Sequence, residues 1–222
     1  MPDTLAALLS GFSGKFGKQD DYLSGLLAEP APVGLGDIVR YNHIRNRWHY
    51  WNGIRWRSDG LGRVQDMVRE KVNQWMGSDG LTGADKSLIL PLLDTNKKER
   101  VLTSLSRRQN IAMRGDEWDR DPFLLGFENG ILDLRTTTFD PQPLSTVLVS
   151  KSVGIDWDPD ANYRDFLKFV GDIMSGDAEL ANYLLTVLGY SLFGLQTEQK
   201  FWMWVGKGQN GKGVLARTML RA

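Results

Sequence analysis

The chain has 222 residues, and 41% of them are apolar, which is enough for a packed core in one or two domains. Its 27 basic and 27 acidic side chains cancel, so the chain has no net charge to draw it to nucleic acid, and any such contact must be local. Because there is no cysteine and there are only two histidines, His43 and His49, the composition excludes a disulfide framework and a cysteine-based zinc module.

The first segment covers residues 1–36. Glycine and proline interrupt every periodic pattern in it, which predicts a flexible N-terminal arm with a short helix around Thr4 to Leu9. The apolar run from Leu5 to Leu9 is too short to span a membrane and lacks the basic flank of a secretion signal. We therefore expect no membrane contact, and the absence of cysteine fits a reducing cytoplasm.

A β-hairpin is expected next, around Asn52 and Gly53, because this dipeptide favours a two-residue turn. The expected register pairs Trp51 with Ile54 and Tyr50 with Arg55, and then His49 with Trp56 and Trp48 with Arg57. It puts His49, Trp51, Ile54 and Trp56 on one face, which we expect to be core, and Trp48, Tyr50, Arg55 and Arg57 on the other.

The second face of this hairpin alternates aromatic rings with arginines, and two interpretations stay open. Arg55 and Arg57 could contact phosphates of single-stranded nucleic acid while bases stack on the rings. Alternatively, the arginines lie across the rings and cover them within the fold.

Two helices should follow the hairpin. Apolar residues at helical spacing predict the first between Gly62 and Met76, with an inward stripe of Val64, Met67, Val68, Val72 and Trp75. The second is expected from Asn96 to Gln109, with Val101, Leu102 and Leu105 facing inward. Between positions 97 and 114 one acid, Glu99, stands among six basic residues, which are Lys97, Lys98, Arg100, Arg107, Arg108 and Arg114. This run is either a patch that contacts phosphates or a solvated helix face.

Residues 123–135 read as strand, turn and strand.

Asp156, Asp158 and Asp160 alternate as in a calcium loop, but Ala161 and Leu167 stand where that loop needs glycine and glutamate, so no metal site is predicted. We expect Asp160 to cap a helix instead. Gly176 and Asp177 then turn the chain into a second helix, which completes a helical hairpin ending at Gly194.

The most informative motif lies near the end. The apolar run Phe201–Val205 predicts a buried parallel strand, and Gly206–Gly213 follows it with nearly the spacing of a phosphate-binding loop. Lys212 would reach the β- and γ-phosphates of ATP, and Gly213 stands where a Ser or Thr hydroxyl would bind Mg²⁺. A helix from Val214 would point its N-terminus at the anion. The expected phosphate-binding set is Gly206, Gly208, Asn210, Gly211, Lys212, Gly213 and Val214. The alternative is a glycine-rich turn without a ligand.

Several segments in the same order resemble the phage and plasmid primase–helicase family, whose motor is a superfamily-3 helicase. They are Asp37–Tyr41, Trp48–Trp56, Glu128–Arg135, Asp156–Ala161, Leu188–Tyr190, Glu198–Phe201 and the loop itself. The resemblance implies a complete protein that binds ATP with Mg²⁺ and assembles a homo-oligomeric ring. It also implies ATP-driven DNA unwinding, with single-stranded or origin DNA as the partner, in the bacterial host cytoplasm.

The resulting expectation is an α+β fold. A flexible arm (1–36) precedes a mixed middle domain with β-hairpins and packed helices (37–155), a helical hairpin (156–197) and the first strand, loop and helix of an α/β ATPase core (198–222). The chain resembles a family member truncated just after the loop, so no catalytic residue is assigned and ATP hydrolysis by this chain alone is not expected. The function is either part of a replication helicase or a non-enzymatic module that binds DNA or a replication partner.

Overall fold

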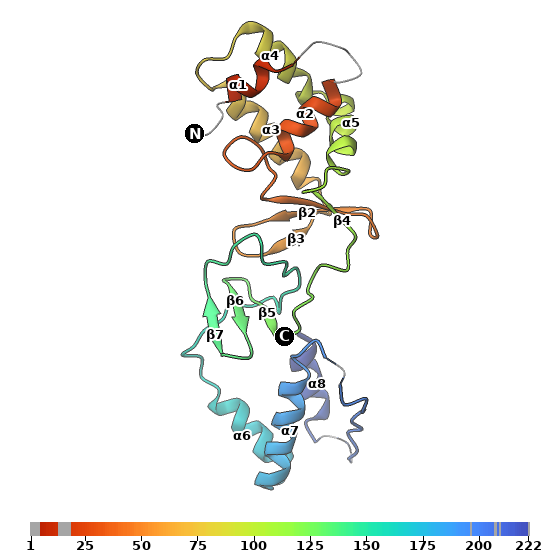
Figure 1. Cartoon of the computed structure of the whole chain (residues 1–222). Coiled ribbons are helices and arrows are strands. Elements are labelled where there is room, and N and C mark those ends of the chain that lie inside the picture. Colours follow the sequence, from red (N-terminus) through yellow and green to blue (C-terminus); the bar gives the residue numbers. More distant parts are fainter. Residues whose placement is uncertain (1–4, 13–18, 196, 207, 209, 222) are drawn as a thin grey trace. The chain divides into compact units, whose positions relative to one another are not determined.

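The computed structural model describes residues 5–12, 19–195, 197–206, 208 and 210–221 (Figure 1). The chain divides into two compact units. The N-unit comprises residues 1–118 with 144–148, and the C-unit comprises residues 119–143 with 149–222. Helices and two small sheets occur together, so the expected mixed α+β class is confirmed.

The N-unit joins a four-stranded sheet to a layer of helices (Figure 1). The strand order is β3-β2-β1-β4, and all neighbours are antiparallel except β1 and β4, which are parallel. The strands are β1 (Val39–Asn42), β2 (Arg47–Trp51), β3 (Trp56–Ser58) and β4 (Ala112–Met113). The helices are α1 (Leu5–Ser10), α2 (Gln19–Ala28), α3 (Arg63–Met76), α4 (Gly83–Ile89), the 3₁₀ turn η2 (Leu90–Leu93) and α5 (Thr95–Leu105).

The predicted helical stripes form the core of the N-unit. All five apolar residues predicted to face inward on α3 are buried, and so are the three on α5. They pack with Val39 of β1, Ile89 and Leu92. Helix α5 ends at Leu105 rather than Gln109, because the chain turns back there to reach β4. Apolar periodicity therefore identified the faces of both helices correctly and overestimated the length of one.

The expectation of an arm is wrong for residues 19–28, which form helix α2. Its Leu23, Leu26 and Leu27 are buried in the same core as α3 and α5. The backbone amide of Leu35 donates to the Leu27 carbonyl, which folds the following segment back on the helix. Apolar burial against α5 thus outweighs the glycine that interrupts the helix at Gly25.

The expected hairpin register is also wrong. Trp51 pairs with Trp56, Tyr50 with Arg57 and His49 with Ser58, so four residues rather than two join the strands. The Asn52 side chain accepts from the amides of Ile54 and Arg55 at 3.1 and 2.8 Å, and this cap closes the longer loop. Because the shift is two residues, each strand residue keeps its predicted face.

Both faces of the hairpin are covered within the N-unit. On the expected core face His49 and Trp56 are buried, and Trp118 stacks on His49 and meets Trp56 edge-on. The Trp56 indole donates to the Ser145 carbonyl at 3.0 Å. On the other face the rings of Trp48 and Tyr50 are half-buried against the helical core.

The C-unit contains a three-stranded antiparallel sheet and three helices. Strands β5 (Leu124–Gly126), β6 (Ile131–Asp133) and β7 (Thr138–Asp140) confirm the predicted strand, turn and strand. The helices are α6 (Arg164–Ile173), α7 (Ala178–Tyr190) and α8 (Lys212–Arg221). The turn predicted at Gly176 and Asp177 is confirmed, and the Asp177 carboxylate caps α7 by accepting from the Leu180 amide at 3.0 Å. The cap at Asp160 is wrong, because α6 begins four residues later at Arg164.

The expected strand Phe201–Val205 does not form in the described structure. Its residues lie in no strand, and Phe201, Met203 and Val205 are 83%, 72% and 82% exposed. A strand needs a partner for its backbone groups, and none of the described strands pairs with it. Within the described residues, no helix is long and apolar enough to cross a membrane.

Candidate functional site

The candidate site is the glycine-rich loop that leads into α8. Lys207 and Gln209 of this loop lie outside the described residues, and the description covers Gly206, Gly208 and 210–213. Helix α8 begins at Lys212 and is ten residues long. The loop therefore lies at the N-terminus of a helix, where the free amides and the helix dipole favour an anion.

Lys212 folds back across the loop. Its ammonium donates to the Gly206 carbonyl at 3.0 Å and to the Asn210 side-chain oxygen at 2.8 Å. A Cβ at position 206 would lie 2.2 Å from the Asn210 amide nitrogen and 3.2 Å from the Lys212 ammonium. A side chain at position 206 would therefore require the end of the Asn210 side chain to move away from the lysine head group.

The C-terminal half of the loop is fixed on α6. Gly211 has φ +80°, and a Cβ there would lie 2.5 Å from a methyl group of Ile173. The Gly211 carbonyl accepts from the amides of Val214 and Leu215, each at 3.0 Å. The Val214 amide, a predicted phosphate donor, is therefore used inside the helix. Lys212 and the amides before it remain the better candidates for phosphate contacts.

Packing holds α8, and with it the loop, on the helical hairpin of α6 and α7. Leu215 is 2% exposed and packs with Val170, Leu184 and Leu188. A cavity of about 480 Å³ separates this hairpin from segment 201–205 and is bordered by Asn210 and Lys212. The Trp202 indole donates to the Tyr183 hydroxyl at 3.0 Å across one side of it.

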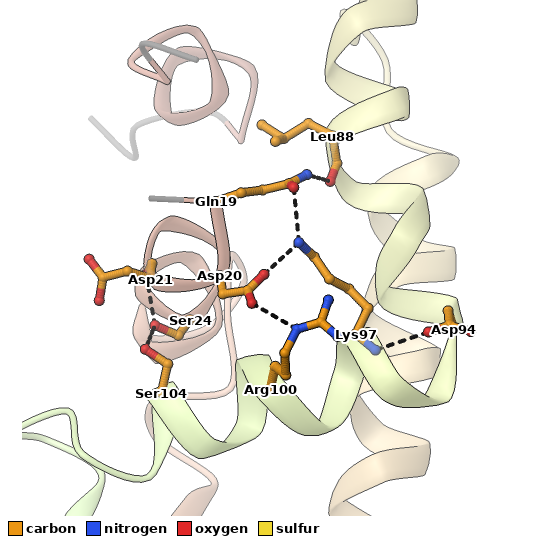
Figure 2. A network of polar contacts seen from close by, with 9 residues as sticks. All are labelled: Gln19, Asp20, Asp21, Ser24, Leu88, Asp94, Lys97, Arg100 and Ser104. Carbon is orange, nitrogen blue, oxygen red and sulfur yellow. Dashed lines mark hydrogen bonds and ion pairs between the residues drawn. The ribbon is translucent and has the colours of Figure 1, made fainter. Parts of the chain in front are cut away.

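Three of the basic residues predicted as candidate phosphate contacts pair with acidic residues of α2. Figure 2 shows the Asp20 carboxylate reaching between Lys97 and Arg100, at 2.5 and 3.1 Å. Arg108 pairs with Asp21 at 2.7 Å and also donates to Ser24. Burial of Asp20 favours a higher pKa, but the hydrogen bonds from Lys97 and Arg100 and their charges outweigh it, so its pKa is lowered.

The remaining predicted nucleic-acid residues do not share one open surface. Lys98 and Arg55 are 3% and 8% exposed, Arg57 is half-buried opposite Tyr50, and Arg107 is exposed after the end of α5. Our residue-based reading overlooked the turn 43–46 between β1 and β2, which presents exposed Arg45 and is followed by exposed Arg47. The sequence does indicate this turn, because Arg45 and Arg47, separated by one residue, lie between two segments with the alternating pattern of strands.

Comparison with protein families supplies the deciding observation. The family model described as "D5 N terminal like" matches residues 27–175, which is more than half of the chain. This chain belongs to the D5 N terminal like family. The matched residues run from the end of α2 to the turn after α6 and include residues of both units.

A viral relative points the same way. The chain is 35% identical over 107 residues to a protein of Acanthamoeba polyphaga mimivirus that is provisionally named a helicase. The aligned residues are 46% of this chain and 11% of that protein, so the chain spans about a tenth of the length of its relative. Family and relative together support the resemblance to primase–helicases.

Proposed function

We propose that this chain is a portion of a superfamily-3 primase–helicase of DNA replication, and that the loop before α8 binds the phosphates of ATP. The observation that supports the proposal is the position of Lys212 at the first turn of α8, from which its ammonium reaches back over the glycine-rich loop to the Gly206 carbonyl. In the complete protein, ATP-driven unwinding by a homo-oligomeric ring on single-stranded or origin DNA is part of this proposal.

The residues present fit a nucleotide phosphate. Within the described loop, Lys212 donates to the neutral oxygens of Gly206 and Asn210, and charged phosphate oxygens would accept stronger hydrogen bonds from its ammonium. The residues present do not supply a metal site. Gly213 has no hydroxyl, and among the described residues no group of three His, Asp or Glu side chains is placed to hold an ion. Mg²⁺, which would neutralise developing phosphate charge, has to find its protein ligands elsewhere.

Calorimetric titration of MgATP into the chain tests the proposal. We expect saturable binding that is weakened at least about tenfold in Lys212→Ala, because a charge-assisted hydrogen bond contributes about 1.5–3 kcal/mol. Lys200→Ala is the matched control, since Lys200 is an exposed lysine of the same unit that pairs with Glu198 at 3.3 Å. Equal affinity of the wild type and Lys212→Ala would contradict a phosphate role for this lysine.

A non-enzymatic module that binds DNA or a replication partner is the second candidate function. It is favoured by the exposure of Phe201, Met203 and Val205, which leaves apolar side chains and backbone groups of segment 201–205 open to another molecule. Absence of any MgATP binding in the same titration would favour this candidate over the first.

A further inference from the structure

The N-unit has a rigid basic turn far along the chain from the loop of Lys212. Residues 43–46 connect β1 to β2, and the side chain of Asn42, which is 1% exposed, accepts from the Arg45 amide at 3.0 Å. Gly115 packs so closely that a Cβ there would lie 2.6 Å from the Asn42 side-chain oxygen. Because Asn42 is enclosed, the turn that carries Arg45 is held in one conformation.

His43 brings arginines from three segments to this turn. Its Nε2 lies 2.9 Å from the Ser106 carbonyl oxygen, and its backbone amide donates to the Met113 carbonyl at 2.9 Å. Arg107 follows Ser106 and Arg114 follows Met113, so both are neighbours of the turn. These two arginines and Arg45 are all exposed. We call Arg45, Arg107 and Arg114 the arginine cluster.

The cluster differs from the basic residues that α2 covers. In the part of the chain that the structure describes, no acidic side chain is within ion-pair distance of Arg45 or Arg107, whereas Lys97 and Arg108 are paired with Asp20 and Asp21. Two acids are close, since the Glu117 carboxylate accepts from the backbone amides of Arg114 and Gly115, and the exposed Asp116 lies beside Glu117. The net charge of the cluster remains positive on a chain that is neutral overall.

A groove of about 330 Å³ lies beside the turn. Tyr41 and Trp48 line one side of it, with ring centroids 5.0 Å apart, and the His43 ring meets Tyr41 edge-on at 4.9 Å. Gln65, Glu99 and Thr103 supply polar groups on the other side. Half-buried aromatic rings with hydrogen-bonding groups opposite suit a planar base, and the charge of Glu99 disfavours a phosphate inside the groove.

We propose that the arginine cluster and this groove bind single-stranded nucleic acid. The arginines contact successive phosphates, and one unstacked base enters the groove against Tyr41 and Trp48. A base can enter only when it is not paired in a duplex, so a single strand is the form that fits. The inference rests on the proposed function in taking DNA as the ligand, and it does not depend on nucleotide binding at Lys212.

Fluorescence anisotropy with a labelled 20-nucleotide oligothymidine tests the inference on the 222-residue chain. We expect Arg45→Ala with Arg107→Ala to weaken binding about tenfold or more. The slope of log affinity against log salt should fall by about 1.4, because each lost phosphate contact on a single strand removes about 0.7. Arg63→Ala with Arg69→Ala is the matched control, since it removes the same charge from exposed positions of α3 in the same unit.

Several results would contradict binding of a single strand by the arginine cluster and the groove. No binding by the wild type, equal weakening in both double variants, or equal affinity for a duplex of the same length would overturn the proposal. Arg45→Lys with Arg107→Lys should keep most of the affinity, and a loss as large as that of the alanine pair would also contradict phosphate contact. The oligonucleotide titrations contain no nucleotide, so failure of the MgATP titration is distinguishable from failure of this proposal.

Discussion

The glycines of the loop differ in how much space surrounds them. Gly211 is required by its backbone, since its φ is +80° and a Cβ there would lie 2.5 Å from a methyl group of Ile173. A Cβ at Gly206 would displace only the end of the Asn210 side chain, 2.2 Å away. Gly213 is different, because the nearest atom to a Cβ there is an Arg217 nitrogen at 3.6 Å. Glycine at position 213 is therefore not demanded by packing, and a larger residue fits.

This space allows a direct test of metal anchoring. We expect Gly213→Ser to raise MgATP affinity about fivefold, because a hydroxyl ligand to the ion is worth about 1 kcal/mol. Titrations with and without Mg²⁺ measure the effect, which should disappear when the ion is removed. Gly213→Ala is the control, and an equal gain in Gly213→Ala would show that helix propensity rather than the hydroxyl is responsible.

At the same scale, the motif spacing predicted a loop followed by a helix, and Lys212 does begin α8, whereas its contact with phosphate stays a prediction. Sequence reasoning failed at Asn52, whose side chain binds two amides and lengthens the turn. It also failed at Asp160, because α6 begins only at Arg164 and has no side-chain cap. Residue type shows which side chains can cap and does not show which of them do.

Among the elements, α2 has the largest effect on the surface of the N-unit. Its Asp20 pairs with Lys97 and Arg100 of α5 (Figure 2), and its Asp21 pairs with Arg108. The ion pairs join residues about 80 positions apart, so local periodicity could not predict them. The stripe on α3, by contrast, was predicted in full because it depends on spacing within one helix.

The pairing of α2 with α5 should make the N-unit sensitive to acid. The folded-state pKa of Asp20 is below its ordinary value of 3.8. The stabilisation that the Asp20 carboxylate gives to the folded N-unit is therefore present at higher pH and is lost as pH falls through that folded-state pKa. Asp20→Asn should lower the free energy of unfolding by about 1 kcal/mol at pH 7 and by less near pH 3.

Urea unfolding followed by circular dichroism at several pH values measures this difference. Asp79→Asn is a suitable control, because Asp79 is an exposed residue of the turn between α3 and α4. A cost of Asp20→Asn that stays constant down to pH 3 would show that the ion pairs do not stabilise the packing of α2.

In segment 201–205, unlike in α3, a clear sequence pattern did not produce the predicted element. Three aromatic residues and two other apolar ones predict a strand well, yet a strand exists only when neighbouring strands complete its hydrogen bonds. The described strands of the C-unit pair only among themselves. Sequence pattern therefore reports the preference of a segment, and the surrounding sheet determines the outcome.

For the whole molecule, the two units differ in the size of their cores. The buried core of the N-unit includes residues from α1, α2, α3, α5 and β1, whereas the helical core of the C-unit consists of Val170, Leu184, Leu188 and Leu215. Buried apolar area is the main favourable term in folding, so the C-unit should be the less stable of the two.

We therefore expect thermal unfolding in two steps. Leu184→Ala should lower the temperature of the first step and leave the second unchanged, and Val72→Ala should do the reverse, because each removes buried methyl groups from one core. Differential scanning calorimetry resolves the two steps. A single transition that both variants shift equally would show that the units unfold as one.

The parallel pairing of β1 with β4 affects the order in which the N-unit can be built. Tyr41 and Asn42 pair with Ala112 and Met113, and β2, β3 and helices α3 to α5 all lie between these partners along the chain. Bringing together two strands so far apart in the sequence costs loop-closure entropy before the contacts between them form. During synthesis on the ribosome, α2 and β1 emerge well before α5 and β4. The apolar faces of α2 and β1 therefore stay exposed until α5 and β4 have been made. Synthesis of this unit thus includes an interval in which holdase chaperones have an exposed target.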